Sequence, residues 1–445
     1  MTVVSLLRIG GITAVVICVF ALRGLWSPQP KPTFSLSAIP RLRAKPLASD
    51  EAETAGTIRF LLQRVRQDPE DFVAQGMLAS YFLQRVRETG NLDDLRLATS
   101  AARASLASVP AQQNTGGLSA LAHAEFAAHE FISARDHAAL LTRLEPDKGA
   151  GWAMLGDVLL ELGDYDGAAR AFDRMQHLGF TSTAAQTRLA RLALLRGDAV
   201  AAYRHLVRGL ALALDLPVPP RETVAWCYWQ LGEVAFSEGE YKAAEEHYRA
   251  ALTTLPGYVN ALPSLGRVRA ARGDLREAIE HYEHAVRIRP DPAFVAALGD
   301  LYALTGRPNE AESRYALVEQ IGRLAVVNGA ASNRPLVLFH ADHNIQTGEA
   351  YREAIKEYGF RRDIYGADAV AWSALKSGRL AEAREAMRSA LRLGTRDARL
   401  FYHAGMIARA AGDDASARKY LDQVLALNPE FDPMQARAVR KVLAR

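Results

Sequence analysis

The feature that most constrains this chain is a pair of small residues that recurs along it with a fixed internal spacing. The first member of the pair is Ala122, Gly156, Ala190, Gly232, Gly266, Gly299, Ala371 and Gly405. An alanine follows each of them twelve positions later, at Ala134, Ala168, Ala202, Ala244, Ala278, Ala311, Ala383 and Ala417. The steps along either series are 34, 34, 42, 34, 33, 72 and 34 residues. Antiparallel helices approach closely only where small side chains meet, so the pattern predicts one helix pair per step.

Larger residues keep the same register around these small ones. The spacing reads Trp152-x2-Leu155-Gly156 with Ala168-x3-Phe172, Tyr228-x2-Leu231-Gly232 with Ala244-x3-Tyr248, and Leu262-x2-Leu265-Gly266 with Ala278-x3-Tyr282. This pattern resembles the tetratricopeptide repeat family, whose unit is a helix–turn–helix of about 34 residues. Because one such unit cannot bury its apolar face alone, the resemblance implies stacking. We therefore expect an all-α solenoid of about ten repeats, wound as a right-handed superhelix behind an N-terminal hydrophobic anchor.

Irregular steps mark where the repeats are interrupted. The step of 42 contains the proline-rich stretch Leu216–Thr223, and the step of 72 contains a degenerate repeat around Ala341 and Ala354. The predicted organisation is a signal anchor or signal peptide (1–26), a proline-rich spacer (27–50), a capping helix (51–71), repeats (72–325), a loop and degenerate repeat (326–363), repeats (364–431) and a C-terminal capping helix (432–445).

The N-terminus carries an apolar run, Ile9–Leu22, between Arg8 and Arg23. Its 14 residues suit a secretory signal and are short for a membrane span, which needs about 17–25 residues. No Ala-x-Ala-like cleavage site follows, which favours a retained anchor, with a cleaved signal peptide as the alternative. We expect membrane attachment through this segment and an extracytoplasmic, periplasmic repeat domain, although the more basic flank is the C-terminal one.

The net positive charge of the chain comes from its beginning. Residues 1–45 hold six basic residues and no acidic one, whereas the chain as a whole has 54 basic and 50 acidic residues. The repeats are thus slightly acidic, and the sequence predicts no nucleic-acid partner.

The sequence offers little for catalysis. It has no Gly-x-Ser-x-Gly elbow, no phosphate-binding Walker loop and no His-Glu-x2-His. His340, Asp342 and His343 could together bind a metal or centre an enzyme, but two histidines and one aspartate form an incomplete ligand set. We predict no catalytic residue, cofactor or metal, and not an enzyme.

The family resemblance also implies a partner-binding surface. In the family, positions 2, 5, 9, 12 and 13 of each first helix line the concave groove, and 2, 5, 9 and 12 share one stripe of a helix. With the small residue as position 8, the groove would show His123, Asp157, Arg191, Trp226, Trp229, Glu233, Phe236, Arg267, Asp300, Tyr365, Asp368, Trp372, Tyr402 and Met406. The predicted partner-binding residues are Arg191, Trp226, Trp229, Glu233, Phe236, Arg267, Asp300, Tyr365, Trp372 and Tyr402.

The mixed charge of this stripe suits an extended peptide or a helix with apolar anchors. We therefore expect a membrane-tethered scaffold that binds protein partners, an assembly or envelope-biogenesis accessory. An accessory of glycan export that stacks sugars on these aromatic residues is the alternative. Trp226 has a second reading, in which the insertion Leu216–Thr223 covers it as part of the core.

Overall fold

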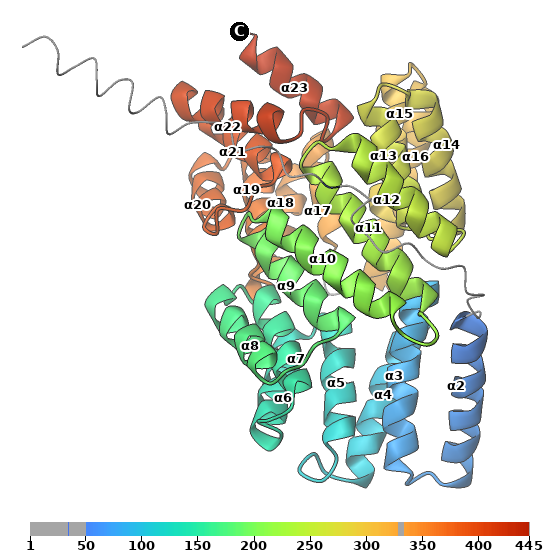
Figure 1. Ribbon diagram of the computed structural model, residues 1–445. Coiled ribbons are helices and arrows are strands. Elements are labelled where there is room, and N and C mark those ends of the chain that lie inside the picture. The colour runs from blue at the N-terminus through green and yellow to red at the C-terminus, as the bar shows by residue number, and fades with distance from the viewer. Residues whose placement is uncertain (1–33, 35–49, 328–332, 445) are drawn as a thin grey trace, which may run out of the picture. The chain divides into compact units, whose positions relative to one another are not determined.

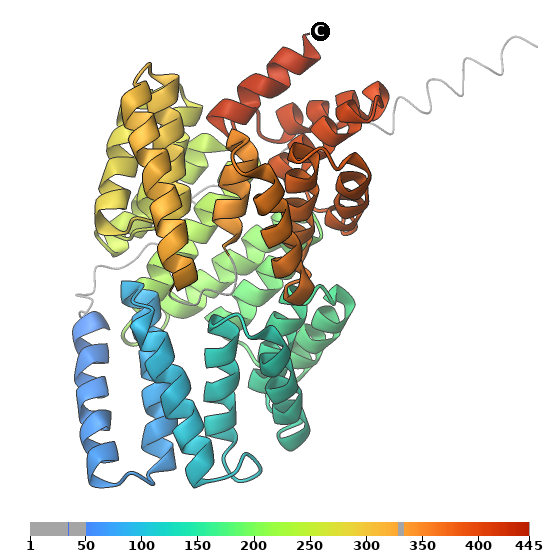
Figure 2. The same cartoon turned by 180° about the vertical axis from the view of Figure 1, so that it is seen from behind.

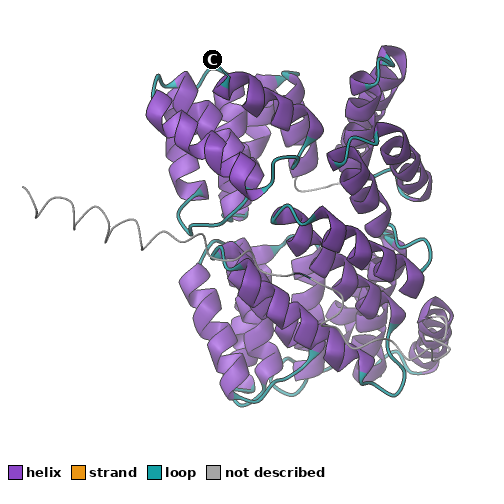
Figure 3. Ribbon diagram, turned by 45° about the horizontal axis from the view of Figure 1, so that its top comes forward, coloured by secondary structure: helices purple, strands orange, loops and turns teal. Residues whose placement is uncertain are grey.

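The computed structural model describes residue 34, residues 50–327 and residues 333–444. This part of the chain contains twenty-two α-helices and no strand (Figure 3). The chain divides into two units, residues 1–34 and 35–445, and all of these helices belong to the second. The expected signal segment, residues 1–26, lies outside the described residues. None of the described helices has both the length and the apolar character needed to cross a membrane.

The helices form ten consecutive antiparallel pairs between two single helices, α2 (Asp50–Gln67) and α23 (Pro433–Leu443) (Figure 1). The first helices of the pairs are α3 (Phe72–Thr89), α5 (Thr115–Ala127), α7 (Gly149–Glu161), α9 (Thr183–Leu195), α11 (Arg221–Ser237), α13 (Ala261–Ala271), α15 (Pro292–Leu304), α17 (Arg334–His343), α19 (Ile364–Lys376) and α21 (Ala398–Ala410). The second helices are α4 (Asp93–Ser108), α6 (Phe131–Leu144), α8 (Tyr165–His177), α10 (Ala199–Leu214), α12 (Tyr241–Thr254), α14 (Leu275–Ile288), α16 (Pro308–Val327), α18 (Thr347–Phe360), α20 (Leu380–Ala390) and α22 (Asp414–Leu427). The all-α repeat architecture predicted from the sequence is confirmed.

The small residues stand where the two helices of a pair cross. A Cβ added to Gly266 would lie 2.7 Å from a ring carbon of Tyr282, and Ala278 on the second helix is fully buried. The turn between paired helices often reads Gly-Asp, as in Gly273-Asp274. The glycine takes the left-handed conformation, and the aspartate caps the second helix by accepting a hydrogen bond from a backbone N–H. The sequence thus specifies each pair by its crossing point and its turn.

The degenerate repeat contains the shortest of the first helices. Helix α17 has ten residues and packs against both α18 and α19. Its capping residue is Asn333, and it ends at Asn344 in the left-handed conformation. The predicted loop before it falls largely on residues 328–332, which lie outside the described residues.

The repeats close on themselves along a line that we call the seam. Three pair turns, α7–α8, α9–α10 and α11–α12, lie against three later junctions, those that follow α18, α20 and α22. Tyr165 Oη accepts a hydrogen bond of 2.8 Å from Ile364 N–H, and Thr395 donates its hydroxyl to the Leu195 carbonyl. Figures 1 and 2 both show the orange and red C-terminal helices beside the green ones. A buried apolar cluster draws on both sides.

Candidate functional site

The first helices of the N-terminal pairs bound a hollow of about 940 Å³, which we call the N-terminal groove. His123, Asp157, Arg191 and Trp226, all predicted groove residues, line it. Arg191 is ion-paired with Glu161, and Asp157 accepts a hydrogen bond of 2.8 Å from Arg188 Nε. The charged side chains of this groove are therefore largely paired with one another.

Trp226 lies between the proline-rich insertion and the N-terminal groove. It is half-buried and lines the N-terminal groove. It also lines a second hollow of about 620 Å³ together with Leu216 and Pro220 of the proline-rich insertion. The insertion packs near Trp226 without removing it from the groove.

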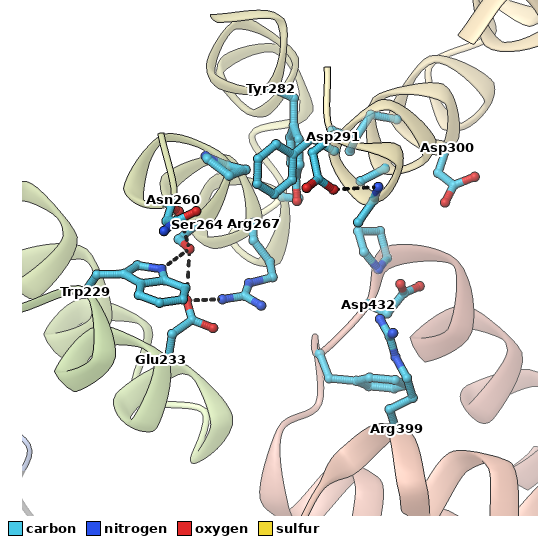
Figure 4. A pocket seen from close by; sticks show the side chains of 18 of the residues that line it. Trp229, Glu233, Asn260, Ser264, Arg267, Tyr282, Asp291, Asp300, Arg399 and Asp432 are labelled. Carbon is cyan, nitrogen blue, oxygen red and sulfur yellow. Dashed lines mark hydrogen bonds and ion pairs between the residues drawn. The ribbon is translucent and has the colours of Figure 1, made fainter. Parts of the chain in front are cut away.

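A second site, which we call the C-terminal chamber, consists of two adjoining hollows of about 440 and 330 Å³. Both are lined by Glu233, Arg267, Arg399 and Phe431. Figure 4 shows the larger hollow, with Glu233, Arg267 and Arg399 labelled. One wall comes mainly from α11, α13 and α15, and the other comes from α17, α19, α21 and the start of α23. The chamber therefore draws on repeats that are far apart in sequence.

Glu233 organises the first wall. Its Oε1 accepts hydrogen bonds from Tyr248 Oη at 2.8 Å, Ser264 Oγ at 2.9 Å and Arg267 Nη2 at 2.6 Å. Burial raises the pKa of Glu233, but the Arg267 charge and these hydrogen bonds outweigh it, so the pKa lies below its ordinary value. Glu233 is thus held as a carboxylate on the chamber wall.

Aromatic side chains flank this charged group. The guanidinium of Arg267 stacks on the Phe236 ring at 4.2 Å, and Phe236 is itself buried. Trp229 donates its indole N–H to Ser264 Oγ at 3.0 Å and meets Tyr258 edge to face. Trp229 stays half-buried, so part of the indole is available to a ligand in the chamber.

Arg399 contributes a positive charge to the second wall. Its side chain is exposed within the chamber, and its guanidinium forms no hydrogen bond or ion pair with any residue in the described ranges. Two nearby carboxylates are already engaged as helix caps, Asp397 on α21 and Asp432 on α23. Burial raises the pKa of Asp432, Arg399 partly offsets this, and Asp342 and Asp300 add to the rise. Arg399 can therefore donate to a ligand.

The remaining predicted residues of this region also line the chamber. Tyr365 and Asp368 lie in the smaller hollow and Asp300 in the larger one. Tyr365 is 39% exposed, whereas Asp368 is buried and accepts a hydrogen bond of 2.8 Å from His403 Nδ1. Burial and the nearby acids Asp397, Asp363 and Asp368 raise the pKa of Tyr365, so its hydroxyl stays protonated.

Three predicted groove residues, Trp372, Tyr402 and Met406, belong instead to a core cluster. Trp372 is only 2% exposed, donates its indole N–H to Asp342 at 2.8 Å and stacks on His403 with ring centroids 4.1 Å apart. Tyr402 is buried as well. The reason is that α17 and α23 pack over this part of the stripe, so here the first helices present it to neighbouring helices rather than to the groove.

The histidines considered for a metal site have separate carboxylate partners. His340 Nε2 lies 2.6 Å from Glu319 Oε1, and His343 Nε2 lies 2.8 Å from Asp300 Oδ1. Asp342 instead accepts from Trp372 and Gln435. Among the described residues, no group of three or more His, Cys, Asp or Glu side chains is placed to hold a metal ion.

The sequence interpretation missed part of the second wall. Arg399 stands six residues before Gly405, which is position 2 of its repeat, so the groove rule contained the signal for it. Phe431 and Asp432 lie in the junction between α22 and α23, outside any repeat position. Nothing in the sequence pattern indicated that this junction would face α13 and α15.

Comparisons with known proteins agree with the architecture. Three family models described as tetratricopeptide repeat match residues 181–257, residues 235–298, and residues 119–179 with 369–430. No curated protein sequence matches the chain.

Several solved structures also match parts of the chain. The match to the structure of the human IFIT1 dimer with PPP-AAAA covers 86% of this chain and 96% of that chain, with 13% identity and a TM-score of 0.43. A MamA crystal structure covers 39% and 90%, with 23% identity and a TM-score of 0.30. A tetratricopeptide repeat protein from Parabacteroides merdae covers 59% and 99%, with 16% identity and a TM-score of 0.32. The family matches together span more than half of the residues, and the chain belongs to the tetratricopeptide repeat family.

Proposed function

We propose that this protein is a scaffold that holds an extended segment of a protein partner in the C-terminal chamber. Tetratricopeptide repeats are in general protein-interaction modules rather than enzymes. We propose further which surface of this protein binds the partner and what kind of segment it holds. The C-terminal chamber is the principal site.

One observation carries the proposal, namely that the chamber offers apolar area and an unpaired hydrogen-bond donor side by side. Trp229 and Phe431 present aromatic surface, and the Arg399 guanidinium has no partner in the described chain. Aromatic and arginine side chains are the residues most enriched at the energetic centres of protein interfaces. A peptide backbone carbonyl or a polar side chain can accept from Arg399 while an apolar side chain packs on Trp229.

The test is selection of peptides on the full-length chain from a random library, followed by calorimetric titration. Trp229→Ala and Arg399→Ala should each weaken binding by about 2 kcal/mol, roughly thirtyfold in Kd. Arg388→Ala, an exposed substitution on helix α20, is the matched control and should leave Kd unchanged. Selected peptides that bind all three variants equally would exclude the chamber as the site.

The location of the protein is a second part of the proposal. The apolar run Ile9–Leu22 supports membrane attachment through residues 1–26 and an extracytoplasmic repeat domain, in the role of an assembly or envelope-biogenesis accessory. The full chain should resist carbonate extraction from membranes, whereas fragment 47–445 should be recovered as a helical protein without detergent. A reporter fused after Arg445 that is active only in the cytoplasm would refute the extracytoplasmic placement.

A further inference from the structure

Three turn glycines on one side of the seam meet three backbone carbonyls on the other. A Cβ added to Gly163 would clash with the Arg362 carbonyl oxygen. One added to Gly197 would lie 2.7 Å from the Gly394 oxygen, and one added to Gly239 would lie 3.0 Å from the Leu427 oxygen. Successive pair turns are thus in register with successive later junctions, and each contact leaves no room for a side chain.

Other turn glycines in equivalent positions show that this crowding is specific to the seam. Gly273, Gly306, Gly378 and Gly412 also have positive φ, and a Cβ added to any of them would meet nothing within 4 Å. The backbone conformation requires glycine in both groups. Only at the seam glycines does a backbone carbonyl also approach so closely that a side chain would not fit.

A network of ion pairs crosses the seam beside these contacts. Arg361 Nε lies 2.7 Å from Glu161 Oε2 on the far side and 3.1 Å from Asp363 Oδ2 on its own side. Arg334 extends this network through ion pairs with Asp363 at 3.1 Å and Glu357 at 2.6 Å. The three carboxylates are almost fully buried, so each depends on its arginines for compensation.

The seam is built from turns and junctions rather than from helices packed along their lengths. Its polar contacts involve few residues, such as the Asn428 side chain donating to the Phe236 carbonyl at 2.7 Å and Tyr241 Oη donating to Asn428 Oδ1 at 2.6 Å. Within each side, by contrast, every pair is held by long helix–helix contacts. Apart from the buried apolar cluster that spans it, the seam is held by these few contacts, and we expect them to break together.

The C-terminal chamber depends on this closure. Glu233, Phe236 and Arg267 come from one side of the seam, whereas Tyr365 and Arg399 come from the other. Separating the two sides would move α11, which carries Glu233 and Phe236, away from α19 and α21. A segment in contact with both walls would then bind the closed form more tightly than the open one.

We propose that the seam opens as one unit while the helix pairs on each side stay folded, and that a segment bound in the chamber holds it closed. The seam is then the entrance to the chamber, and occupancy and closure are linked. The second half of this inference rests on the proposed function. The first half concerns the chain alone and needs no partner.

The experiment is hydrogen exchange followed by mass spectrometry on the full chain without ligand. Two amides report on the seam, Ile364 N–H, bonded to Tyr165 Oη, and Glu430 N–H, 3.1 Å from Tyr241 Oη. Gly163→Ala should speed exchange at both amides by about tenfold, including the distant Glu430, and leave helix α13 unchanged. Gly273→Ala, the control with the same backbone strain, should leave both amides unchanged.

Two results would overturn the opening of the seam as a unit. One is faster exchange at Ile364 alone, and the other is equal acceleration in helix α13. If Gly163→Ala does not fold, Thr395→Val removes only the hydroxyl bond to Leu195 and is compared with Thr253→Val, whose hydroxyl bonds within its own helix. Faster exchange at both Ile364 and Glu430 would again support opening as a unit, and faster exchange at Ile364 alone or in helix α13 would again overturn it.

The linkage is tested with a peptide selected as above, added at saturating concentration. Exchange at Ile364 and Glu430 should slow by about tenfold or more relative to the free protein. A peptide that binds through Trp229 and Arg399 without slowing these amides would overturn the linkage and leave the proposed function intact. Failure to select any peptide would count against the proposed function and leave the ligand-free exchange result as it stands.

Discussion

Arg361 Nε lies 2.7 Å from Glu161 Oε2, although the two residues are 200 positions apart in the sequence. Glu161 also pairs with Arg191, so one buried carboxylate on α7 is shared between a neighbouring repeat and a distant one. Burial raises the pKa of Glu161, but the two guanidinium charges outweigh it, and the pKa is lowered. This ionised group ties the degenerate repeat to the N-terminal half of the solenoid.

Arg361→Ala should destabilise the protein, because it removes one of the two guanidinium groups that compensate the buried Glu161 carboxylate. We expect a loss of roughly 2–4 kcal/mol, at the lower end of the range for buried pairs since Arg361 is partly exposed. Urea denaturation measures it. Arg388→Ala, which breaks an exposed pair with Glu385, should cost under about 1 kcal/mol. Equal losses for the two variants would show that the seam pair contributes no more than a surface pair.

Gly266→Leu should force apart the two helices of its pair. Even a Cβ would lie 2.7 and 2.9 Å from ring carbons of Tyr282, so the larger side chain overpacks the crossing. The expected cost is about 1–3 kcal/mol or more in thermal denaturation. His284→Ala on the exposed face of α14 is the control and should cost within about 0.5 kcal/mol. A tolerated Gly266→Leu would contradict the assigned crossing point.

The stability that His343 contributes should depend on pH. Both ring nitrogens face acceptors, the Phe339 carbonyl and the Asp300 carboxylate, each at 2.8 Å, which requires the imidazolium. Burial lowers the pKa of His343, but the hydrogen bond and charge of Asp300 outweigh it, so the pKa is raised above its ordinary value near 6.5. A raised pKa means that this stability is fully present below the unfolded pKa and lost as pH rises through the folded one.

Asp300→Asn should remove this dependence. The difference in melting temperature between wild type and Asp300→Asn is therefore expected to be larger at pH 5.5 than at pH 9. A difference that grows with rising pH would have the opposite sign and would exclude a cationic His343.

Trp372 and Trp229 should separate stability from binding. Trp372 is buried against His403, so Trp372→Ala is expected to cost about 3–5 kcal/mol. Trp229 keeps exposed area in the chamber, and Trp229→Ala should cost less than half as much while weakening peptide binding. Thermal denaturation and calorimetry on both variants decide this, and the reverse ranking of stability would contradict the placement of the two indoles.

The helix pairs could be predicted because their determinants are local and periodic. Gly266 and Ala278 are twelve residues apart, and the turn Gly273-Asp274 lies between them. One short segment therefore contains both the crossing residues and the turn of a helix pair. The seam could not be predicted in this way. Gly163 lies in a Gly-Asp turn that reads the same as Gly273, although one faces a carbonyl and the other faces open space.

The candidate site followed the sequence only where the first-helix stripe stays uncovered. Trp229, Glu233 and Arg267 were predicted from their repeat positions and do line the chamber. The same rule failed for Trp372, because α17 and α23 cover α19 and α21, and that packing depends on contacts outside the repeat. Binding of a partner by these residues remains a prediction.

The seam also sets an order of events while the protein is being made. Tyr165 and Phe236 leave the ribosome early, but their counterparts, Ile364 and Asn428, are about 200 residues further on. At the usual rate of synthesis, about 5–20 residues per second, the turns of α7 to α12 stay uncovered for roughly 10–40 s. Through that interval Tyr165 and its apolar neighbours stay exposed in the unfinished chain, the kind of surface that chaperones bind.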